Sequence, residues 1–413
     1  MMTTYLLRFE KILAHRFWGI IVFLCMMWLM FFSTFYIGAF PMSWIETAIS
    51  AAANFCKKAI PNDTLGEFLA YGVIEGVGSV LAFLPNIIIL FFFIAFFQMS
   101  GLSQRFALLM DKLMHGIGLH GSSFIPLLMG FGCNVPAILG TRIIPKKTDR
   151  LVTMLMIPFM SCSARLPVYI LLIGTFFPES PLLILMLLYV SGILLAILTA
   201  FVINKFIFKP EKDNSDIYHC RLHKPEIKPM LQMVWDAASE FLKKIGTVVL
   251  LAVITIWFLN HYPRHDDAAN NEHRSYLERV GETVAPVFKP MGFDWKMSVS
   301  LLSGLPAKEF IVGTMSVLYN TQTDDTPNQE LVGERLKNEV YLTGAKAGKP
   351  VFNKAVALAF LFFSLLYMPC IGVIVSIYKE SQSVKWAFFT VFYTISLAWV
   401  VSFAVYRITL FWI

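Results

Sequence analysis

The sequence predicts an all-α polytopic integral membrane protein built from two inverted repeats with interrupted helices. Hydrophobic residues make up 57% of the 413 residues and charged residues only 15%, whereas charged residues are about a quarter of a soluble domain. The apolar residues gather in long runs, and glycine and proline interrupt two apolar stretches. These observations indicate helices that cross a bilayer, together with irregular backbone at membrane depth.

Seven apolar runs reach or approach the ~20 residues that a helix needs to cross a hydrocarbon core about 30 Å thick. They lie at 17–36, 82–99, 151–177, 181–204, 245–260, 353–378 and 387–411. The first run is long for a secretory signal peptide and lacks a small-residue cleavage site, so we expect it to be the first transmembrane helix. Arg8, Lys11 and Arg16 precede it and predict a cytoplasmic N-terminus.

Residues 1–81 are expected to form an N-terminal part made of a lead-in helix, the first span and an interfacial segment. The segment from Pro41 to Asp63 has mixed polarity, which is typical of a helix lying at the outer interface. Small residues follow at Gly72, Gly76 and Gly78, where they let another helix pack closely.

The first repeat is predicted at 82–206. Its stretch 123–140 is too rich in glycine and proline for a plain span and too apolar for a water-exposed loop. Such backbone is tolerated at membrane depth only where protein buries it or where it lines a cavity, so we expect a re-entrant or interrupted helix. Basic residues at 142–150 follow, which predicts that both ends of this hairpin face the cytoplasm.

The second repeat is predicted at 242–413, after a basic cytoplasmic connector at 207–241 that ends in an amphipathic helix. It repeats the order of the first: a span, a broken stretch (298–318), a charged linker and two further spans. Its SLLYMPCIGVIVSIY corresponds to MIPFMSCSARLPVYI in the first repeat, which aligns Cys370 with Cys162. An odd number of crossings between the repeats inverts them and places a binding site near the midplane. Seven crossings put the C-terminus outside, and eight put it inside.

The net charge of +7 does not indicate a nucleic-acid partner. The lysines and arginines stand at the ends of apolar runs, as the positive-inside rule requires, so membrane lipid is the expected surrounding. The six cysteines lack CxxC pairs and framework spacing, which argues against a zinc knuckle or a disulfide scaffold. GAKAGK at 344–349 lacks the spacing and the Ser or Thr of a phosphate-binding loop.

Cysteines and ionisable residues in the broken stretches are the candidates for chemistry. Cys133, Cys162 and Cys370 each lie near a helix-breaking residue. Their thiolates would be soft ligands for a transition metal, but free cysteine also behaves as a small buried hydrophobe. Glu309 and Arg165 are ionisable residues in apolar stretches, where a functional role is the default hypothesis. We favour such a role for Glu309, and for Arg165 a structural clamp on backbone carbonyls or on Glu309.

Histidines and methionines near the first broken stretch are weaker candidates. His115 and His120 lie just outside it and could feed ions toward it or satisfy an interface, and the sequence does not choose between these roles. Met154, Met156 and Met160 offer thioethers, but packing explains them better.

Four motifs resemble the two gate motifs of the ferrous iron transport protein B (FeoB) family. They are GFGCNVPAI at 130–138, PFMSCSARLPVY at 158–169, GLPAKEFIVGT at 304–314 and YMPC at 367–370. Supporting matches are FLPN at 83–86, MHGIGLHG at 114–121 and SFIPLLMG at 123–130, so the resemblance covers essentially the whole chain. It implies a transporter of the bacterial inner membrane, not an enzyme, that imports Fe(II) as substrate and holds no permanent cofactor.

The resemblance also assigns residues. It places Cys133 and Cys162 in the first gate and Glu309 and Cys370 in the second, and these four are the expected metal ligands. The expected lining of the path is Gly130, Gly132, Asn134, Pro136, Met160, Ser161, Arg165, Lys308 and Pro369.

Two departures from the family pattern bear on partners and ion exit. Typical members begin with a cytosolic GTP-binding domain and a small helical domain, so we expect either an excised fragment or a chain served by a separate GTPase. A small FeoA-like cytosolic protein and a homo-oligomer are further expected partners. Members also carry an acidic pair and Gly-Tyr after the second span, where this chain reads Gln98, Met99, Ser100, Gly101 and Leu102. This leaves the ion-exit step and the identity of the metal open.

Three alternatives remain at this stage. The substrate could be Mn(II) or another divalent metal. The chain could instead carry a nucleoside or another organic solute on the same fold, bound by Asn134, Ser161 and Glu309. The third alternative is a membrane scaffold that transports nothing. In such a scaffold the broken helices and a buried Glu309 would have no evident use.

Overall fold

The computed structural model describes residues 15–60, 66, 68–208, 226–244, 246–247, 250–262, 275–319, 322–323, 326–327, 329–340, 348 and 350–412. Regular structure in these residues is helical apart from the antiparallel pair β1 (Gln322–Thr323) and β2 (Thr326–Pro327), which confirms the all-α fold class. Five helices in the described ranges are long and apolar enough to cross a membrane, or six if one bent pair is a single span. The seven or eight spans expected from the sequence stay a prediction.

The chain divides into two compact units. Unit 1 comprises Met1–Ile157 and Ala196–Val253, and unit 2 comprises Pro158–Leu195 and Ile254–Ile413. The chain therefore leaves unit 1 after its first gate motif, contributes one helical hairpin to unit 2, and returns. The repeats at 82–206 and 242–413 stay a prediction about topology.

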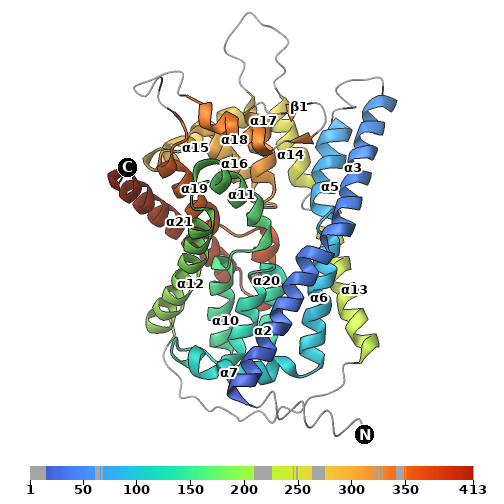
Figure 1. Ribbon diagram of the computed structural model, residues 1–413, viewed down its shortest axis with the longest axis vertical. Coiled ribbons are helices and arrows are strands. Elements are labelled where there is room, and N and C mark those ends of the chain that lie inside the picture. The colour runs from blue at the N-terminus through green and yellow to red at the C-terminus, as the bar shows by residue number, and fades with distance from the viewer. Residues whose placement is uncertain are drawn as a thin grey trace, which may run out of the picture. The chain divides into compact units, whose positions relative to one another are not determined.

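Unit 1 begins with a long helix that does not end at the first span. The helix α2 (Arg16–Phe32) passes through the π-helical turn η1 (Ser33–Ile37) into α3 (Ala39–Ala59), as Figure 1 shows. Its 43 residues from Phe17 to Ala59 measure about 64 Å, twice the thickness of a hydrocarbon core. The segment expected at the outer interface is thus helical but continues the first span. The π turn keeps the chain hydrogen-bonded, since the Gly38 N–H donates to the Ser33 carbonyl (3.1 Å).

The remaining described residues of unit 1 form shorter helices. α6 (Leu84–Met99) and α7 (Leu102–His115) are bent by 90° at a break that contains Gly101, whose φ of 75° is a conformation that glycine adopts without strain. The elements are η2 (Phe68–Glu75), α5 (Gly76–Leu81), α6 (Leu84–Met99), α7 (Leu102–His115), η3 (Gly121–Ser123), α8 (Phe124–Met129), α9 (Asn134–Gly140), η4 (Thr141–Ile143), α10 (Lys147–Met156) and α13 (Ile227–Lys244).

The amphipathic helix predicted at the end of the connector is α13. Met230, Val234 and Ala238 are buried on the side that packs against α6, while Leu231 and Trp235 are exposed. The residues 209–225 of the predicted connector lie outside the described residues.

Unit 2 is organised around the buried helix α19 (Lys354–Leu366), which packs along α21 (Val384–Trp412). The buried residues of α21 include Thr390, Thr394 and Ala398, small side chains that allow close helix approach. Its other elements are η5 (Ile157–Phe159, shared with unit 1), η6 (Ser163–Arg165), α11 (Leu166–Phe176), α14 (Leu250–His261, also shared with unit 1), α15 (Tyr276–Phe288), η8 (Lys289–Met291), α16 (Trp295–Ser303), α17 (Phe310–Leu318), α18 (Gln329–Asn338) and α20 (Ile371–Ser381).

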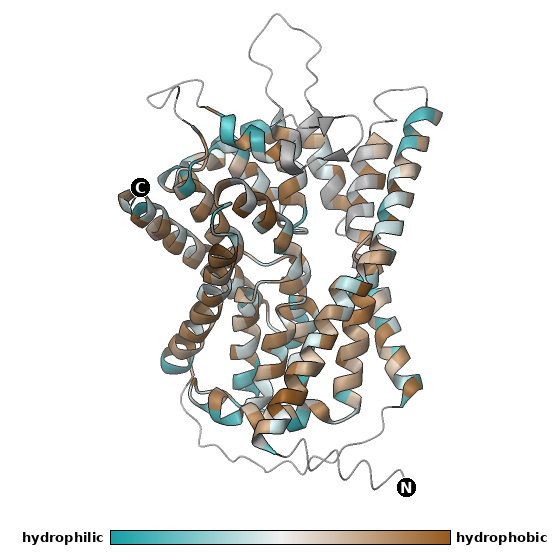
Figure 2. Ribbon diagram, in the orientation of Figure 1, coloured by the Kyte–Doolittle hydropathy of each residue, from teal (hydrophilic) through white to brown (hydrophobic). Residues whose placement is uncertain are grey.

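The helix α12 (Pro181–Phe206) contains residues of both units and has the surface of a lipid-facing span. Figure 2 shows it apolar along most of its length, and Leu182, Leu183 and Phe201 are each more than half exposed. An apolar surface of this kind is typical of a helix that faces lipid.

Candidate ion path

The first gate motif interrupts a helix in unit 1, as the sequence predicts. α8 ends at Met129 and α9 begins at Asn134, and the four residues between them form the gate 1 turn (Gly130–Cys133). The Gly132 and Cys133 N–H groups both donate to the Met129 carbonyl at 3.0 Å, and Cys133 has extended backbone. The turn is therefore a defined structure that places a half-buried cysteine at the start of a helix.

Asn134 directly follows the gate 1 turn and carries an unused oxygen. The residue is 4% exposed, and its Oδ1 is buried without a hydrogen-bond partner. Because nearly all buried polar atoms find a partner, this oxygen is available to a ligand. Gly130, Gly132 and Pro136 around it are buried, so the backbone packs closely here.

The motif PFMSCSARLPVY forms a second break, from Pro158 to Arg165, in unit 2. Arg165 is 1% exposed, and its two terminal nitrogens donate to the carbonyls of Met160 (3.1 Å) and Pro158 (3.2 Å). This confirms the interpretation of Arg165 as a clamp on backbone carbonyls. Ser161 is buried 3.1 Å from the Tyr169 hydroxyl, and Cys162 is half-buried on extended backbone before η6.

The second gate motif also interrupts a helix. α16 ends at Ser303 and α17 begins at Phe310, and the gate 2 turn (Gly304–Glu309) joins them. A Cβ at position 304 would lie 2.5 Å from Ile311 Cγ1 and 2.6 Å from the Tyr367 hydroxyl oxygen, so glycine lets the turn approach Tyr367 closely. This close approach brings the turn against the fourth motif, YMPC.

YMPC is a further break, between α19 and α20. Tyr367 and Cys370 have extended backbone at its two ends. Two hydrogen bonds fasten this break to the gate 2 turn: Ile371 N–H donates to the Leu305 carbonyl (3.2 Å), and Lys308 Nζ donates to the Met368 carbonyl (2.7 Å). Pro369, which lies between Met368 and Cys370, is buried.

Three of the four predicted metal ligands therefore belong to unit 2. Lys308 interacts electrostatically with Arg165 as well as with the predicted ligands Cys370, Cys162 and Glu309, so groups from three helix breaks lie near one lysine. The Glu309 Oε2 is buried and accepts no hydrogen bond. Cys133 belongs to unit 1. Within the described residues no group of three or more His, Cys, Asp or Glu side chains could hold a metal ion together, so the donors are spaced along helix breaks and do not form a closed site.

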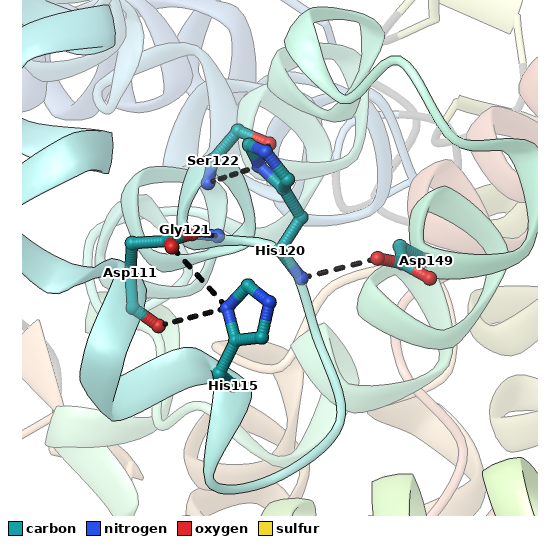
Figure 3. A network of polar contacts seen from close by, with 6 residues as sticks. All are labelled: Asp111, His115, His120, Gly121, Ser122 and Asp149. Carbon is teal, nitrogen blue, oxygen red and sulfur yellow. Dashed lines mark hydrogen bonds and ion pairs between the residues drawn. The ribbon is translucent and has the colours of Figure 1, made fainter. Parts of the chain in front are cut away.

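The two histidines beside the first gate take part in a local network, drawn in Figure 3. His115 Nδ1 lies 3.3 Å from Asp111 Oδ2, and Asp111 Oδ1 accepts from the Gly121 N–H (2.8 Å). The His120 N–H donates to Asp149 Oδ2 (3.1 Å), and its Nδ1 lies 2.9 Å from Ser122 Oγ, so the network joins α7, η3 and α10. These contacts give both histidines a structural use, which favours the interface role.

Sequence reasoning missed a cluster at the base of the α16–α17 hairpin. Asp294 Oδ1 accepts from Met297 N–H (2.8 Å) at the start of α16, and Oδ2 accepts from the Tyr319 hydroxyl (3.4 Å) after α17. Burial raises the pKa of Asp294 to about 6. Lys296 Nζ lies 2.6 Å from Glu339 Oε1 and 4.5 Å from the centroid of the Tyr319 ring. The N-cap position of Asp294 before an apolar helix was the available signal.

The fold and these breaks define a multi-pass membrane protein with paired interruptions in its helices. The chain belongs to the Gate family, whose model is described as nucleoside recognition and matches residues 80–176 and 242–384.

The chain is also similar to curated iron transporters. It is 42% identical to the Fe(2+) transport protein A/Fe(2+) transporter FeoB fusion protein of Porphyromonas gingivalis, over 97% of this chain and 51% of that protein. The Fe(2+) transporter FeoB of Campylobacter jejuni is 39% identical over 96% of this chain and 64% of its own length, and that of Staphylococcus aureus 37% identical over 97% and 59%. These relatives confirm the resemblance to the FeoB family. The chain spans between half and two thirds of their length, and no solved structure matches it.

Proposed function

We propose that the chain forms the transmembrane path of a ferrous iron importer and moves Fe(II) across the bacterial inner membrane into the cytoplasm. The observation that carries the proposal is that Cys162, Cys370 and Glu309 all stand at helix breaks of unit 2, and that two hydrogen bonds fasten the breaks of Glu309 and Cys370 to each other. The relatives named Fe(2+) transporters supply the metal.

The proposed metal ligands suit an ion that must enter the path and also leave it. Fe(II) is a borderline metal that accepts both thiolate and carboxylate ligands. The unpartnered oxygens of Glu309 and Asn134 can replace water molecules of its hydration shell, as oxygens do in ion-selective paths. Conduction requires sites weak enough to release the ion, so spaced donors suit it better than a closed metal cage.

Cys133 is the proposed ligand of unit 1. It precedes Asn134, so a thiol and an unpartnered amide oxygen stand on consecutive residues at the gate 1 turn. In this proposal the ion meets this pair at one gate and the cluster of Cys162, Cys370 and Glu309 at the other, in two repeats of inverted topology.

The proposal includes partners that drive or control transport. We propose a cytoplasmic N-terminus, a GTPase that drives or controls transport, and a small FeoA-like cytosolic protein. The fusion of Fe(2+) transport protein A to the FeoB of Porphyromonas gingivalis supports the last of these.

The test is Fe(II) uptake by anaerobic liposomes that contain the purified chain. Replacing Cys133, Cys162 and Cys370 together by serine is expected to abolish most uptake, because serine is a poor ligand for a borderline metal. The matched control replaces Cys25 and Cys56, which lie on α2 and α3 outside the gates. Uptake that survives the triple replacement unchanged would refute the cysteine path.

Competition in the same liposome assay tests whether a nucleoside or Mn(II) is also a substrate. The Gate family description, nucleoside recognition, favours an organic solute as the second candidate. Excess nucleoside is expected to leave Fe(II) uptake unchanged, whereas inhibition by nucleoside with replaceable cysteines would favour that carrier. Excess Mn(II) measures how far the path separates the two metals.

A further inference from the structure

Lys308 lies in the gate 2 turn and is 2% exposed. Its Nζ donates to the Met368 carbonyl at 2.7 Å and lies 3.2 Å from the centroid of the Tyr367 ring. A carbonyl oxygen and the face of an aromatic ring both attract a positive charge. The amino group therefore occupies a position built to receive a cation.

The groups around this position are electron-rich and incompletely used. Glu309 Oε2 and the Tyr367 hydroxyl are buried without hydrogen-bond partners. Arg165, Cys370 and Cys162 interact electrostatically with Lys308, and the positive charge of Arg165 acts against that of the lysine. A lysine buried at membrane depth is costly, so its presence calls for a role. Fastening the turn is not enough to explain it, because the Leu305–Ile371 hydrogen bond already joins the same two segments.

Arg165 provides an instructive contrast. Its planar guanidinium holds two carbonyls at once, which is a rigid arrangement. Lys308 makes one hydrogen bond from a flexible four-carbon stem, so its amino group can withdraw without unfolding the turn.

We propose that Lys308 is a tethered occupant of the gate 2 cation position, and that an entering divalent ion must displace its amino group from Met368 and Tyr367. The inference rests on the proposed function and deepens it. Since the Coulomb attraction of a divalent ion to a carboxylate such as Glu309 is twice that of a monovalent ion, a competing amino group discriminates against monovalent cations. Lys308 is thus assigned as a residue that sets ion affinity and selectivity.

The test compares metal binding by two variants of the full chain, measured by equilibrium dialysis of Fe(II) and Mn(II) under anaerobic conditions. Lys308→Gln can still donate to Met368 but carries no charge, and it is expected to bind divalent ions at least about tenfold more tightly, a change of ~1.4 kcal/mol. Lys308→Arg keeps the charge and is expected to bind no more tightly than the wild type. Lys296→Gln, a lysine outside the gate that pairs with Glu339, serves as the control.

Each outcome separates the inference from the function on which it rests. If the wild type binds and imports Fe(II) while Lys308→Gln binds it no more tightly, the tethered occupant is wrong and the importer stands. If no protein binds Fe(II), both fall. If Lys308→Gln does not fold, Lys308→Met takes its place in the binding assay. If neither variant folds, Lys308 has a structural role and the inference is overturned.

Discussion

Asp294 joins the two ends of the gate 2 hairpin, since one carboxylate oxygen caps α16 and the other accepts a hydrogen bond from Tyr319 at the end of α17 (3.4 Å). Asp294 therefore helps to close the base of the hairpin that carries Lys308 and Glu309. This arrangement leads to a prediction about pH.

The stability of the chain is expected to depend on pH through Asp294. Burial raises its pKa from 3.8 to about 6. Between these values the folded protein holds a proton that the unfolded chain has released, so the free energy of unfolding falls as pH rises from about 4 to 6. Asp294→Asn keeps a good N-cap and is expected to lose this dependence. Thermal unfolding in detergent across that range measures it.

The control for this experiment is Glu179→Gln, which changes an exposed carboxylate and is expected to keep the wild-type slope. An Asp294→Asn protein with the same slope as the wild type would show that another group titrates.

Removing the Arg165 clamp is expected to be strongly destabilising. Arg165→Met leaves the carbonyls of Pro158 and Met160 without their donors in a buried setting, and breaking such an arrangement costs about 3 kcal/mol or more. Arg165→Lys, which supplies one donor group instead of a fork, is expected to lie between the wild type and Arg165→Met. The midpoints of thermal unfolding rank the three proteins, and equal midpoints would mean that the clamp is unimportant.

Two glycines of unit 2 are expected to respond in opposite ways to alanine. A Cβ at Gly192 would lie 2.7 Å from the Phe159 carbonyl oxygen, whereas one at Gly174 would meet nothing within 4 Å. Gly192→Ala is expected to cost about 1–3 kcal/mol through overpacking. Gly174→Ala, in the helix α11, is expected to stabilise by about 0.5–1 kcal/mol because alanine has less freedom in the unfolded chain. Similar unfolding midpoints for both variants would contradict the packing at Gly192.

Asn134 is expected to serve function at the cost of stability. Asn134→Val replaces the amide by an apolar side chain of similar size and removes a buried oxygen that has no partner, which should stabilise the protein by about 1 kcal/mol or more. Fe(II) uptake should fall, because the path loses an oxygen ligand. Thermal unfolding and liposome uptake on the same preparation give both numbers. A destabilised variant with normal uptake would assign Asn134 a purely structural role.

The sequence by itself determined the class of protein and the places where helices break. Composition and apolar runs indicate a polytopic helical protein, and local chemistry places the interruptions at 130–133 and 304–309, because glycine and proline act on their own stretch of backbone. It did not determine that α3 continues the first span, since a π turn through Ser33–Ile37 keeps a segment of mixed polarity helical.

Only the tertiary structure decided which broken segments meet. Lys308 and Met368 are sixty residues apart, yet a 2.7 Å hydrogen bond joins them, and Asp294 reaches Tyr319 across a whole hairpin. Such pairs depend on how helices pack against α19 and α21, because packing selects among many partners that the sequence allows equally. Packing likewise left the oxygens of Asn134 and Glu309 buried and unpartnered, a property that no residue pattern displays.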